Sequence, residues 1–194
     1  MRLGLFGGTF DPIHDAHLTL AHAAVAACAL DQLIFIPAAR PPHRSAGPRA
    51  AYEDRLRMVE LAIAGTPAFA ASRVEAGDAV SYSIDTIEKI SASQPGAELF
   101  FVIGADAFAE IRTWKRWEDV VAAVQFIVAA RPGADYQAPA GAVVHAVPLQ
   151  MNISSSGVRA LLAQGASPVP VAPSVLAYIR AHGLYSSPTR NLSR

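Results

Sequence analysis

The amino-acid sequence predicts an α/β fold, in which helices pack on both faces of a mostly parallel sheet to give a three-layer sandwich with a small helical part at the C-terminus. Short apolar segments alternate with longer helix-forming segments along the chain. Turn residues such as Gly and Pro separate the two kinds of segment. Because parallel strands need long crossover connections, we expect the helical segments to join successive strands of one sheet.

The first βαβ unit has the clearest pattern. Residues 2–6, RLGLF, are typical of a short buried strand that closes at Gly7 and Gly8. Residues 15–29 are rich in alanine and contain neither Gly nor Pro, which favours a helix. The apolar residues 32–38 then predict the next strand, parallel to the first.

The remaining elements continue this alternation. Residues 39–50 hold three prolines and three arginines and predict a loop, because proline continues neither a helix nor a central strand. Further strands are expected at 69–74, 98–106, 125–133 and 142–149, and further helices at 51–65, 81–93, 155–164 and 173–182. We expect residues 1–185 to form a single domain and residues 186–194 to be a disordered tail.

Composition and charge exclude several classes of protein. Sixteen Lys and Arg balance sixteen Asp and Glu, so the chain has no general attraction for nucleic acid. The single cysteine, Cys28, excludes an internal disulfide and a cysteine-based zinc site, and we expect it in the core. No secretory signal or membrane-length apolar run is visible, so we expect a cytoplasmic protein with no nucleic-acid or membrane partner.

The stretch GGTFDPIHDAHL, residues 7–18, stands where the first strand gives way to the first helix. Its two glycines allow the backbone to approach a ligand closely, and amide groups before a helix can bind phosphate. The spacing matches neither the dinucleotide-binding fingerprint nor the P-loop. Taken alone, the stretch fits a phosphate-binding loop or a plain strand-to-helix turn.

His14 and His17 lie three residues apart and are expected to share one face of the helix start. A zinc site needs at least a third ligand, and the other histidines are scattered along the chain. We therefore expect no metal bound by the protein itself. We expect both imidazoles to donate hydrogen bonds to phosphate oxygens instead.

The stretch ISSSGVR, residues 153–159, places three serines where a helix is expected to start. Arg159 follows one turn later, so its guanidinium can reach back to the same place. Hydroxyls, backbone amides and an arginine together suit a phosphate group. An ordinary serine cap with a solvated arginine is the alternative for this stretch alone.

Three segments follow directly after expected strands: residues 7–9, the loop after Pro37 and residues 104–106. In sheets of parallel strands, ligands bind beyond the carboxyl ends of the strands. We therefore expect these segments to line the same edge of the sheet.

The pairing of GGTFDPIHDAHL with ISSSGVR resembles the nucleotidyltransferase superfamily that is marked by a His-x-Gly-His motif. Further stretches narrow the resemblance to the bacterial nicotinate mononucleotide adenylyltransferases: PPHR at 41–44, SYSIDTI at 81–87, GADAF at 104–108, RTWKRWEDV at 112–120, ARPG at 130–133 and YIRAHGLY at 178–185. They occur in the family's order over residues 1–185.

This resemblance implies a Rossmann-like fold and a reaction in NAD biosynthesis. In that reaction nicotinate mononucleotide takes the adenylyl group of ATP, which gives nicotinate adenine dinucleotide and pyrophosphate. The resemblance also implies Mg²⁺, which ATP brings with it.

Site residues are implied in the same way. Catalytic contacts to the ATP phosphates fall on His14, His17 and Arg159. The ATP-binding residues are Gly7, Gly8, Thr9, Phe10, His14, His17, Gly104, Asp106, Ser154, Ser155, Ser156 and Arg159. The nicotinate nucleotide is assigned to Arg44, Ser81, Tyr82, Ser83 and Trp114. In this assignment Trp114 stacks on the pyridine ring, and backbone amides of residues 81–83 meet its carboxylate.

One residue departs from the family pattern. Ala16 stands between the two histidines, where the family has glycine. Its methyl group is tolerable if the backbone φ is negative and the gap to the nucleotide exceeds one methyl group, so we expect activity. Ser156 stands where threonine is common, which keeps the hydroxyl group.

Other functions remain open from the sequence. A phosphopantetheine transferase is disfavoured because a linear thiol has no ring for Trp114 to contact, whereas a nicotinamide mononucleotide transferase is harder to exclude. A nucleotide-binding regulator without catalysis is favoured by Ala16 and opposed by the two histidines and Arg159. The sequence does not give the oligomeric state.

Overall fold

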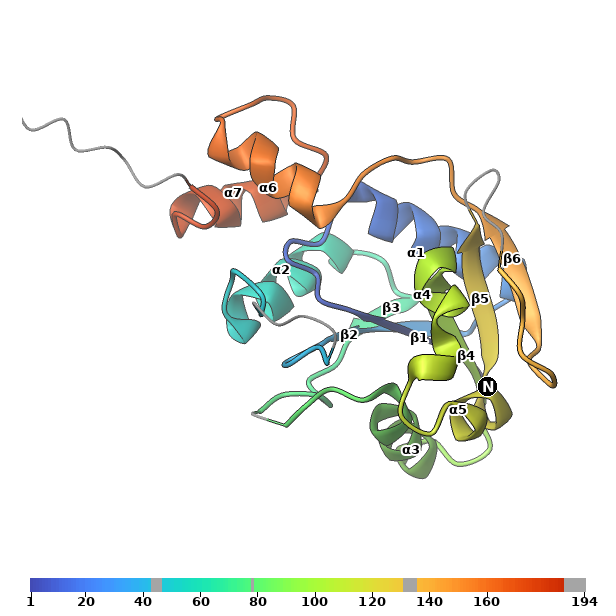
Figure 1. The fold of residues 1–194 in the computed structure, drawn as a ribbon. Coiled ribbons are helices and arrows are strands. Elements are labelled where there is room, and N and C mark those ends of the chain that lie inside the picture. The colour runs from blue at the N-terminus through green and yellow to red at the C-terminus, as the bar shows by residue number, and fades with distance from the viewer. Residues whose placement is uncertain (43–46, 78, 131–135, 187–194) are drawn as a thin grey trace, which may run out of the picture.

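The structure, a computed structural model, describes residues 1–42, 47–77, 79–130 and 136–186. They form a six-stranded sheet with helices on both faces (Figure 1). The strands are β1 (Arg2–Gly8), β2 (Gln32–Pro37), β3 (Phe69–Ala71), β4 (Glu98–Gly104), β5 (Gln125–Ala130) and β6 (Val144–Pro148). The helices are α1 (Asp15–Cys28), α2 (Tyr52–Ile63), α3 (Ser83–Ser93), α4 (Ala105–Ala109), α5 (Trp117–Ala123), α6 (Ser155–Ala163) and α7 (Pro173–Ala181), with a 3₁₀ turn, η1 (Ile111–Thr113).

The strand order is β3-β2-β1-β4-β5-β6, and all neighbouring pairs of the described strands are parallel. The chain runs outward from β1 to β3, returns to the centre, and then runs outward on the other side from β4 to β6. The direction of winding therefore reverses between β1 and β4. In such sheets the crevice beyond the carboxyl ends of the strands at the reversal is the usual ligand site. The expected α/β sandwich is confirmed.

Residues along each central strand alternate between two hydrophobic cores. Phe6 of β1 and Phe100 of β4 belong to one core, whereas Leu5 and Phe101 belong to the other. Helices α1, α2, α6 and α7 cover the first face, and α3, α4 and α5 cover the second (Figure 1). Both faces of the strands are thus buried, which explains why the strands are almost continuously apolar.

The segment between β4 and β5 differs from the expectation. The sequence pattern predicted no helix there, whereas the structure has α4, η1 and α5. These elements are short. Helix α4 buries Ala105 and Phe108, and α5 buries Val120 and Val121. Two buried residues in one or two turns are too few to give a recognisable helical period.

Two further expectations concern boundaries. Strand β3 spans three residues, although the apolar pattern predicted a strand over 69–74. Residues 187–194 of the expected tail lie outside the described residues. The limits of the predicted domain stay a prediction.

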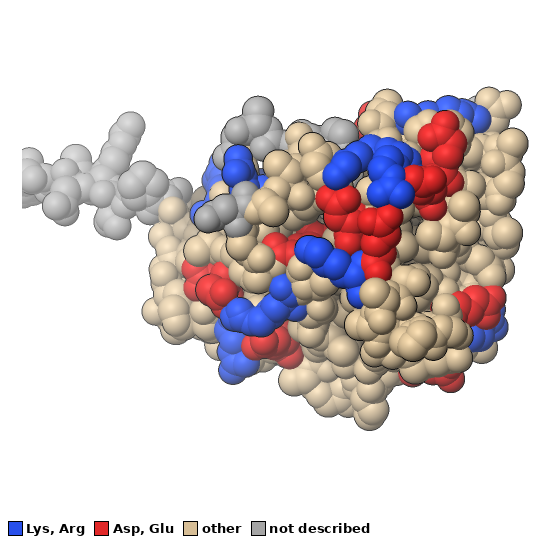
Figure 2. Space-filling model, turned by 90° about the horizontal axis from the view of Figure 1, so that it is seen from below, with Lys and Arg blue, Asp and Glu red and all other residues tan. Residues whose placement is uncertain are grey.

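Charges of both signs are intermixed on the underside of the molecule, where α3 lies (Figure 2). Lys115 pairs with Asp85 at 3.0 Å, and Arg116 pairs with Glu88 at 2.9 Å. Exposed pairs of this kind contribute little to stability, roughly 0–1 kcal/mol each.

Among the described helices, none has the length and apolar character needed to cross a membrane.

Arg55 on α2 is the largest fully buried side chain among the described residues, with 1% of its surface exposed. Its Nη1 donates to the carbonyl oxygens of Thr9 at 2.7 Å and Ala38 at 2.8 Å. Its Nε donates to the carbonyl oxygen of Ala50 at 3.2 Å. Arg55 therefore ties together the segments that follow β1 and β2 and the segment that precedes α2.

Replacing Arg55 by leucine is expected to lower the free energy of unfolding by about 3 kcal/mol or more, because one buried and two partly buried carbonyl groups lose a charged donor. Urea denaturation measures the change. Arg57→Leu is the control, since Arg57 lies on the same helix, is exposed and pairs with Glu60 at 3.0 Å. We expect the control to lose less than about 1 kcal/mol. Equal losses in the two variants would contradict the structural role of Arg55.

Candidate functional site

Two cavities meet beyond the carboxyl ends of β1 and β4, where the strand order reverses. One has a volume of about 730 Å³ and the other of about 300 Å³. Phe6, Gly7, Gly104 and Ala107 line both cavities. Two ligands can therefore bind side by side and bring reacting groups together over these shared residues.

The larger cavity lies among α1, α4 and α6. It brings together most of the residues expected to bind ATP, namely Gly7, His14, His17, Gly104, Asp106, Ser154, Ser155, Ser156 and Arg159. Ala16 also lines it and is buried. Because Ala16 is helical, its backbone meets the first of the two conditions for a tolerated methyl group.

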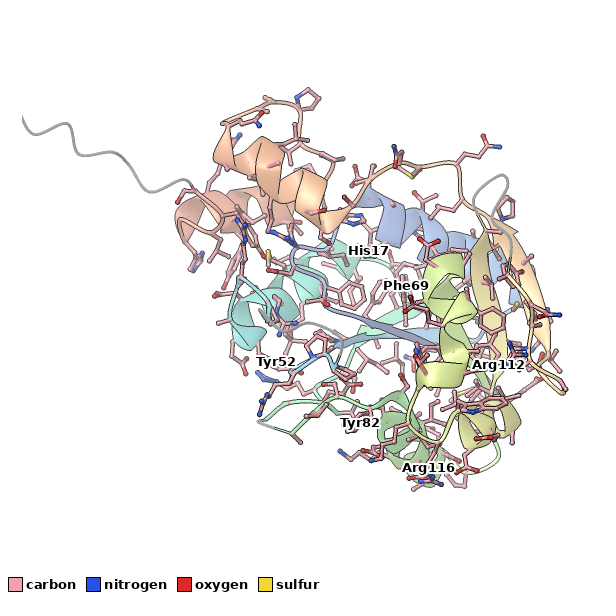
Figure 3. The ribbon with its side chains drawn as sticks, viewed as in Figure 1. His17, Tyr52, Phe69, Tyr82, Arg112 and Arg116 are labelled. Carbon is pink, nitrogen blue, oxygen red and sulfur yellow. The ribbon has the colours of Figure 1, made fainter. Side chains whose placement is uncertain are left out.

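The two histidines form a pair at the start of α1, and His17 is labelled in Figure 3. His14 is the residue that caps the helix, and its ring stacks on that of His17 with 3.7 Å between the ring centroids. The backbone N–H of His14 donates to Nδ1 of His17 at 3.2 Å. Because Nδ1 accepts this bond, a neutral His17 carries its proton on Nε2 and can donate it to a ligand.

Burial keeps both imidazoles neutral. It lowers the pKa of His14 from 6.5 to about 4. The pKa of His17 lies well below its ordinary value, because of burial and the neighbouring His14. Within the described residues, Nδ1 of His14 is buried without a hydrogen-bond partner. At neutral pH the pair therefore offers N–H donors instead of positive charge.

The serine stretch begins α6 beside the histidine-bearing loop. Ser154 caps the helix and accepts a hydrogen bond from the backbone N–H of Gly157 at 3.2 Å. Ser155 donates to the carbonyl oxygen of Pro12 at 3.0 Å. The hydroxyl oxygens of Ser154 and Ser156 lie 3.0 Å apart. Ser155 thus fixes α6 against the first motif, while its two neighbours keep their hydroxyls at the mouth of the cavity.

The smaller cavity lies between the loop after β2, the start of α3 and the loop before α5. The cavity is lined by four of the residues that the resemblance assigned to the nicotinate nucleotide, namely Ser81, Tyr82, Ser83 and Trp114. Trp114 packs edge-on against Phe101, with 5.9 Å between the ring centroids. Tyr82 lies on the α3 side of the sheet (Figure 3). Arg44, the remaining residue of this group, lies outside the described residues.

Ser81 joins two walls of this cavity. Its hydroxyl accepts hydrogen bonds from the backbone N–H groups of Ala39 at 3.0 Å and Arg40 at 3.3 Å. The backbone N–H of Ser81 donates to the carbonyl oxygen of Arg40, and that of Tyr82 to Val80. The amides of Ser81 and Tyr82 are therefore already engaged, and the amides that follow them in the first turn of α3 lack helical partners.

Sequence reasoning missed two charged residues that line the smaller cavity, Glu75 and Lys115. Glu75 accepts a hydrogen bond from the Thr86 hydroxyl at 2.6 Å, and burial raises the pKa of its carboxyl group. The ammonium group of Lys115 lies 4.5 Å from the centre of the Tyr82 ring and 3.0 Å from the carboxylate of Asp85. Glu75 belongs to no stretch with a recognisable binding pattern, and Lys115 lies in the stretch RTWKRWEDV, in which only Trp114 was assigned a role.

Three residues expected at ATP lie elsewhere. Gly8 and Thr9 line the smaller cavity, and Phe10 lies in the core with 1% of its surface exposed. A side-chain carbon at Gly8 would come within 2.9 Å of the Phe10 ring. Gly8 therefore makes room for Phe10 inside the turn. Contacts of these three residues with ATP stay a prediction.

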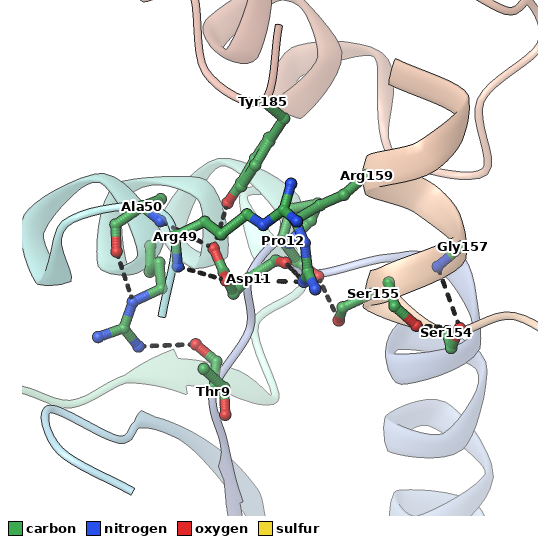
Figure 4. A network of polar contacts seen from close by, with 12 residues as sticks. Thr9, Asp11, Pro12, Arg49, Ala50, Ser154, Ser155, Gly157, Arg159 and Tyr185 are labelled. Carbon is green, nitrogen blue, oxygen red and sulfur yellow. Dashed lines mark hydrogen bonds and ion pairs between the residues drawn. The ribbon is translucent and has the colours of Figure 1, made fainter. Parts of the chain in front are cut away.

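A polar network that the sequence did not predict connects the two motifs (Figure 4). The carboxylate of Asp11 accepts hydrogen bonds from the backbone N–H groups of Arg49 at 2.8 Å and Ala50 at 3.1 Å. It also accepts one from the Tyr185 hydroxyl at 2.7 Å. Arg159 donates to the backbone carbonyl oxygen of Asp11 at 2.6 Å. Tyr185 lies 174 positions from Asp11, so no pattern of neighbouring residues predicts the contact.

The parallel sheet, the reversal of strand order and a cavity that presents imidazoles, hydroxyls and a guanidinium define a nucleotide-binding α/β protein. In the described part of the chain, no group of three or more His, Cys, Asp or Glu side chains is placed to hold a metal ion.

Known proteins narrow this class. The family model described as "Cytidylyltransferase-like" matches residues 5–161. A Solibacter usitatus protein named "Probable nicotinate-nucleotide adenylyltransferase" is 54% identical over 188 residues, which cover 96% of this chain and 100% of that protein. A Thermus thermophilus protein of the same name is 43% identical, and the match covers 95% of this chain and 100% of that protein. The chain belongs to the nicotinate-nucleotide adenylyltransferase family.

Solved structures agree on the fold. The Plasmodium falciparum nicotinic acid mononucleotide adenylyltransferase complexed with NaAD superposes with a TM-score of 0.79 at 18% identity, over 95% of this chain and 97% of that chain. The same enzyme complexed with APC gives a TM-score of 0.76 over 95% and 96% of the two chains.

The low pKa of His14 makes stability depend on pH. The unfolded chain takes up a proton on this imidazole near pH 6.5, whereas the folded protein does so near pH 4. The unfolded state therefore binds more protons between these values, and the free energy of unfolding falls as the pH is lowered through this window, by up to about 3 kcal/mol from this residue. We expect His14→Gln to lose that part of the pH dependence in urea denaturation. An acid-side slope equal to that of the wild type would contradict the burial of a neutral His14.

Proposed function

We propose that this protein transfers the adenylyl group of ATP to nicotinate mononucleotide, which gives nicotinate adenine dinucleotide and pyrophosphate. The observation that carries the proposal is the meeting of two cavities over Gly7 and Gly104, one lined by phosphate-binding groups and the other by Trp114. The names of the relatives are independent support. The reaction belongs to NAD biosynthesis, and we place it in the cytoplasm.

The nucleophile of this reaction is a phosphate oxygen of the acceptor. A phosphomonoester loses its second proton at about pH 6, so the oxygen is ionised at neutral pH and needs no general base. This oxygen forms a bond to the α-phosphorus of ATP, and the bond from that phosphorus to the pyrophosphate oxygen breaks. The protein's task is to bring two anions together and to stabilise charge on the α-phosphate and the leaving pyrophosphate.

On the ATP side, His14 and His17 donate hydrogen bonds to oxygens of the α- and β-phosphates. The Nε2 proton of His17 supports this role, because a donor held in place by the backbone needs no rearrangement when charge develops. Arg159, with the hydroxyls of Ser154 and Ser156, holds the β- and γ-phosphates. Each hydrogen bond to a charged group contributes about 1.5–3 kcal/mol.

Beyond the phosphates, Gly104 and Asp106 belong to the nucleotide side. The exposed carboxylate of Asp106 on the cavity wall suits the hydroxyl pair of a ribose. Mg²⁺ enters with ATP, because this ion is bound mostly by phosphate oxygens and water, with one or two carboxylates from a protein. When bound, it supplies positive charge at the phosphates.

On the acceptor side, Trp114 stacks on the pyridine ring. The carboxylate of the ring is received at the N-terminus of α3 by the amide of Ser83 and those that follow it, because the amides of Ser81 and Tyr82 donate to backbone carbonyls. Ser81 and Tyr82 act by shaping the wall. We assign the acceptor phosphate to Arg44, which the described residues do not include.

The test is a pyrophosphate-release assay with ATP, Mg²⁺ and either nicotinate or nicotinamide mononucleotide. We expect turnover with both ATP and the nicotinate nucleotide present, and slower turnover with the amide, which lacks the negative charge that α3 receives. Absence of pyrophosphate with either acceptor would favour a nucleotide-binding regulator instead of an enzyme. Faster turnover with the amide would overturn the assignment of the acceptor.

In the same assay we expect His17→Ala to lower turnover at least tenfold, which corresponds to about 1.4 kcal/mol or more of lost transition-state stabilisation. His22→Ala is the matched control, because His22 lies on the same helix, is exposed and lines neither cavity. Wild-type turnover in His17→Ala would count against the phosphate role of the histidine pair.

Ala16→Gly tests the departure from the family pattern. A helical alanine on the wall of a roomy cavity leaves space for the nucleotide, so we expect the KM for ATP to stay within about twofold of the wild type. The same change is expected to lower the free energy of unfolding by about 1 kcal/mol, since glycine is a poor helix former. A KM for ATP that falls fivefold or more would show that the methyl group obstructs the nucleotide.

A further inference from the structure

The carboxylate of Asp11 is buried, with 1% of the residue's surface exposed, and it accepts hydrogen bonds from two distant segments. Its Oδ2 accepts from the backbone N–H of Arg49, and its Oδ1 accepts from the N–H of Ala50 and from the Tyr185 hydroxyl (Figure 4). Because two successive amides reach different oxygens and Tyr185 reaches Oδ1 from a distant segment, the carboxylate has one orientation that satisfies all three donors.

Arg159 is held at one end by the same residue. Its Nη1 donates to the backbone carbonyl oxygen of Asp11 at 2.6 Å and lies 3.6 Å from Oδ2 of the carboxylate. The side chain is only 15% exposed and lines the larger cavity. Its Nε is buried without a hydrogen-bond partner in the described part of the chain. One nitrogen of the guanidinium is thus anchored at Asp11, while the side chain lines the cavity.

Tyr185 completes this arrangement from the segment after α7. Burial and the hydrogen bond to Asp11 raise the pKa of its hydroxyl group, so the hydroxyl remains a donor throughout the neutral range. The Tyr185 hydroxyl shares Oδ1 with one backbone amide, and this leaves Oδ2 on the side of Arg159.

We propose that Asp11 and Tyr185 are positioning residues that orient Arg159 toward the phosphates of ATP. The proposal rests on the proposed function, in which Arg159 binds the β- and γ-phosphates. Without the Tyr185 hydroxyl, the carboxylate keeps its charge and its two backbone donors but loses a donor on Oδ1, so more of its negative charge is left to attract Arg159. The guanidinium would be drawn to Asp11 and away from the cavity.

The first experiment compares Tyr185→Phe with Tyr178→Phe in the full-length protein. Tyr178 lies on α7, and its hydroxyl donates to Asp54 at 2.9 Å, so each variant removes one tyrosine–aspartate hydrogen bond from the same part of the chain. We expect Tyr185→Phe to lower kcat/KM for ATP about threefold to tenfold and to leave the KM for the nicotinate nucleotide unchanged. Tyr178→Phe is expected to change neither. Equal effects of the two variants, or an equal effect on both substrates, would overturn the proposal.

A double-mutant cycle with Arg159→Ala measures the coupling between Tyr185 and Arg159, which a purely structural role of Tyr185 would not produce. If Tyr185 acts through Arg159, Tyr185→Phe has no further effect on kcat/KM for ATP in the Arg159→Ala background. A loss of the same size in both backgrounds would overturn the proposal while leaving the proposed function intact. Full activity of Arg159→Ala would overturn the phosphate role of Arg159 and the positioning proposal with it.

Asp11→Asn gives a second variant in case Tyr185→Phe does not fold. The amide keeps one acceptor oxygen but loses the charge that faces Arg159. We expect the same selective loss in kcat/KM for ATP, and again no further loss in the Arg159→Ala background. A folded Asp11→Asn protein with wild-type kinetics for ATP would contradict the proposal.

Discussion

Strand β1 pairs with β2 on one side and with β4 on the other, and the rest of the structure depends on these two ladders. The register sets Gly7 beside Ile36 and Phe6 beside Val102, so the neighbouring strands end at the same edge. Because the winding reverses here, the carboxyl ends of β1 and β4 open into one crevice. Helices α1 and α4 begin near this edge, which is why the histidine pair and the acidic residue of α4 line the same cavity.

Two buried charges of opposite sign then fix the loops around the crevice. Arg55 donates to the carbonyl oxygens of Thr9 and Ala50, and Asp11 accepts from the backbone N–H of Ala50. Two side chains therefore join the turn after β1 to the segment before α2: Arg55 acts as the hydrogen-bond donor and Asp11 as the acceptor. A buried charge is costly unless it has hydrogen-bond partners, and these contacts supply partners to both side chains. Arg159 of α6 lies close to the same carboxylate. The side chain that holds the loops in place therefore also contacts a residue that we expect to bind phosphate.

Much of the fold and part of the site were accessible from the sequence. Long elements such as α1 and β4 were predicted because many residues share one period, whereas α4 and α5 were missed because each buries two residues. Most of the polar residues that line the larger cavity were found because histidines and serines gather in two short stretches. Asp11 and Tyr185 lie in stretches that the resemblance marked, but neither their contact nor the role of Arg55 gave a signal, because a side chain that bonds to distant segments leaves no local pattern. The division between two cavities was equally hidden: Gly8 and Gly7 are adjacent in sequence, yet Gly8 lines only the smaller cavity and Gly7 lines both.

The central claim is that the reversal between β1 and β4 holds two substrates in adjoining cavities with their phosphates in contact. A crystal structure with a non-hydrolysable ATP analogue and nicotinate mononucleotide tests it most directly. The account predicts the triphosphate between the histidine pair and Arg159, and the pyridine ring on Trp114. The acceptor phosphate should then lie next to the α-phosphate, over Gly7 and Gly104. An adenine base on Trp114, or a triphosphate away from the histidine pair, would contradict the account.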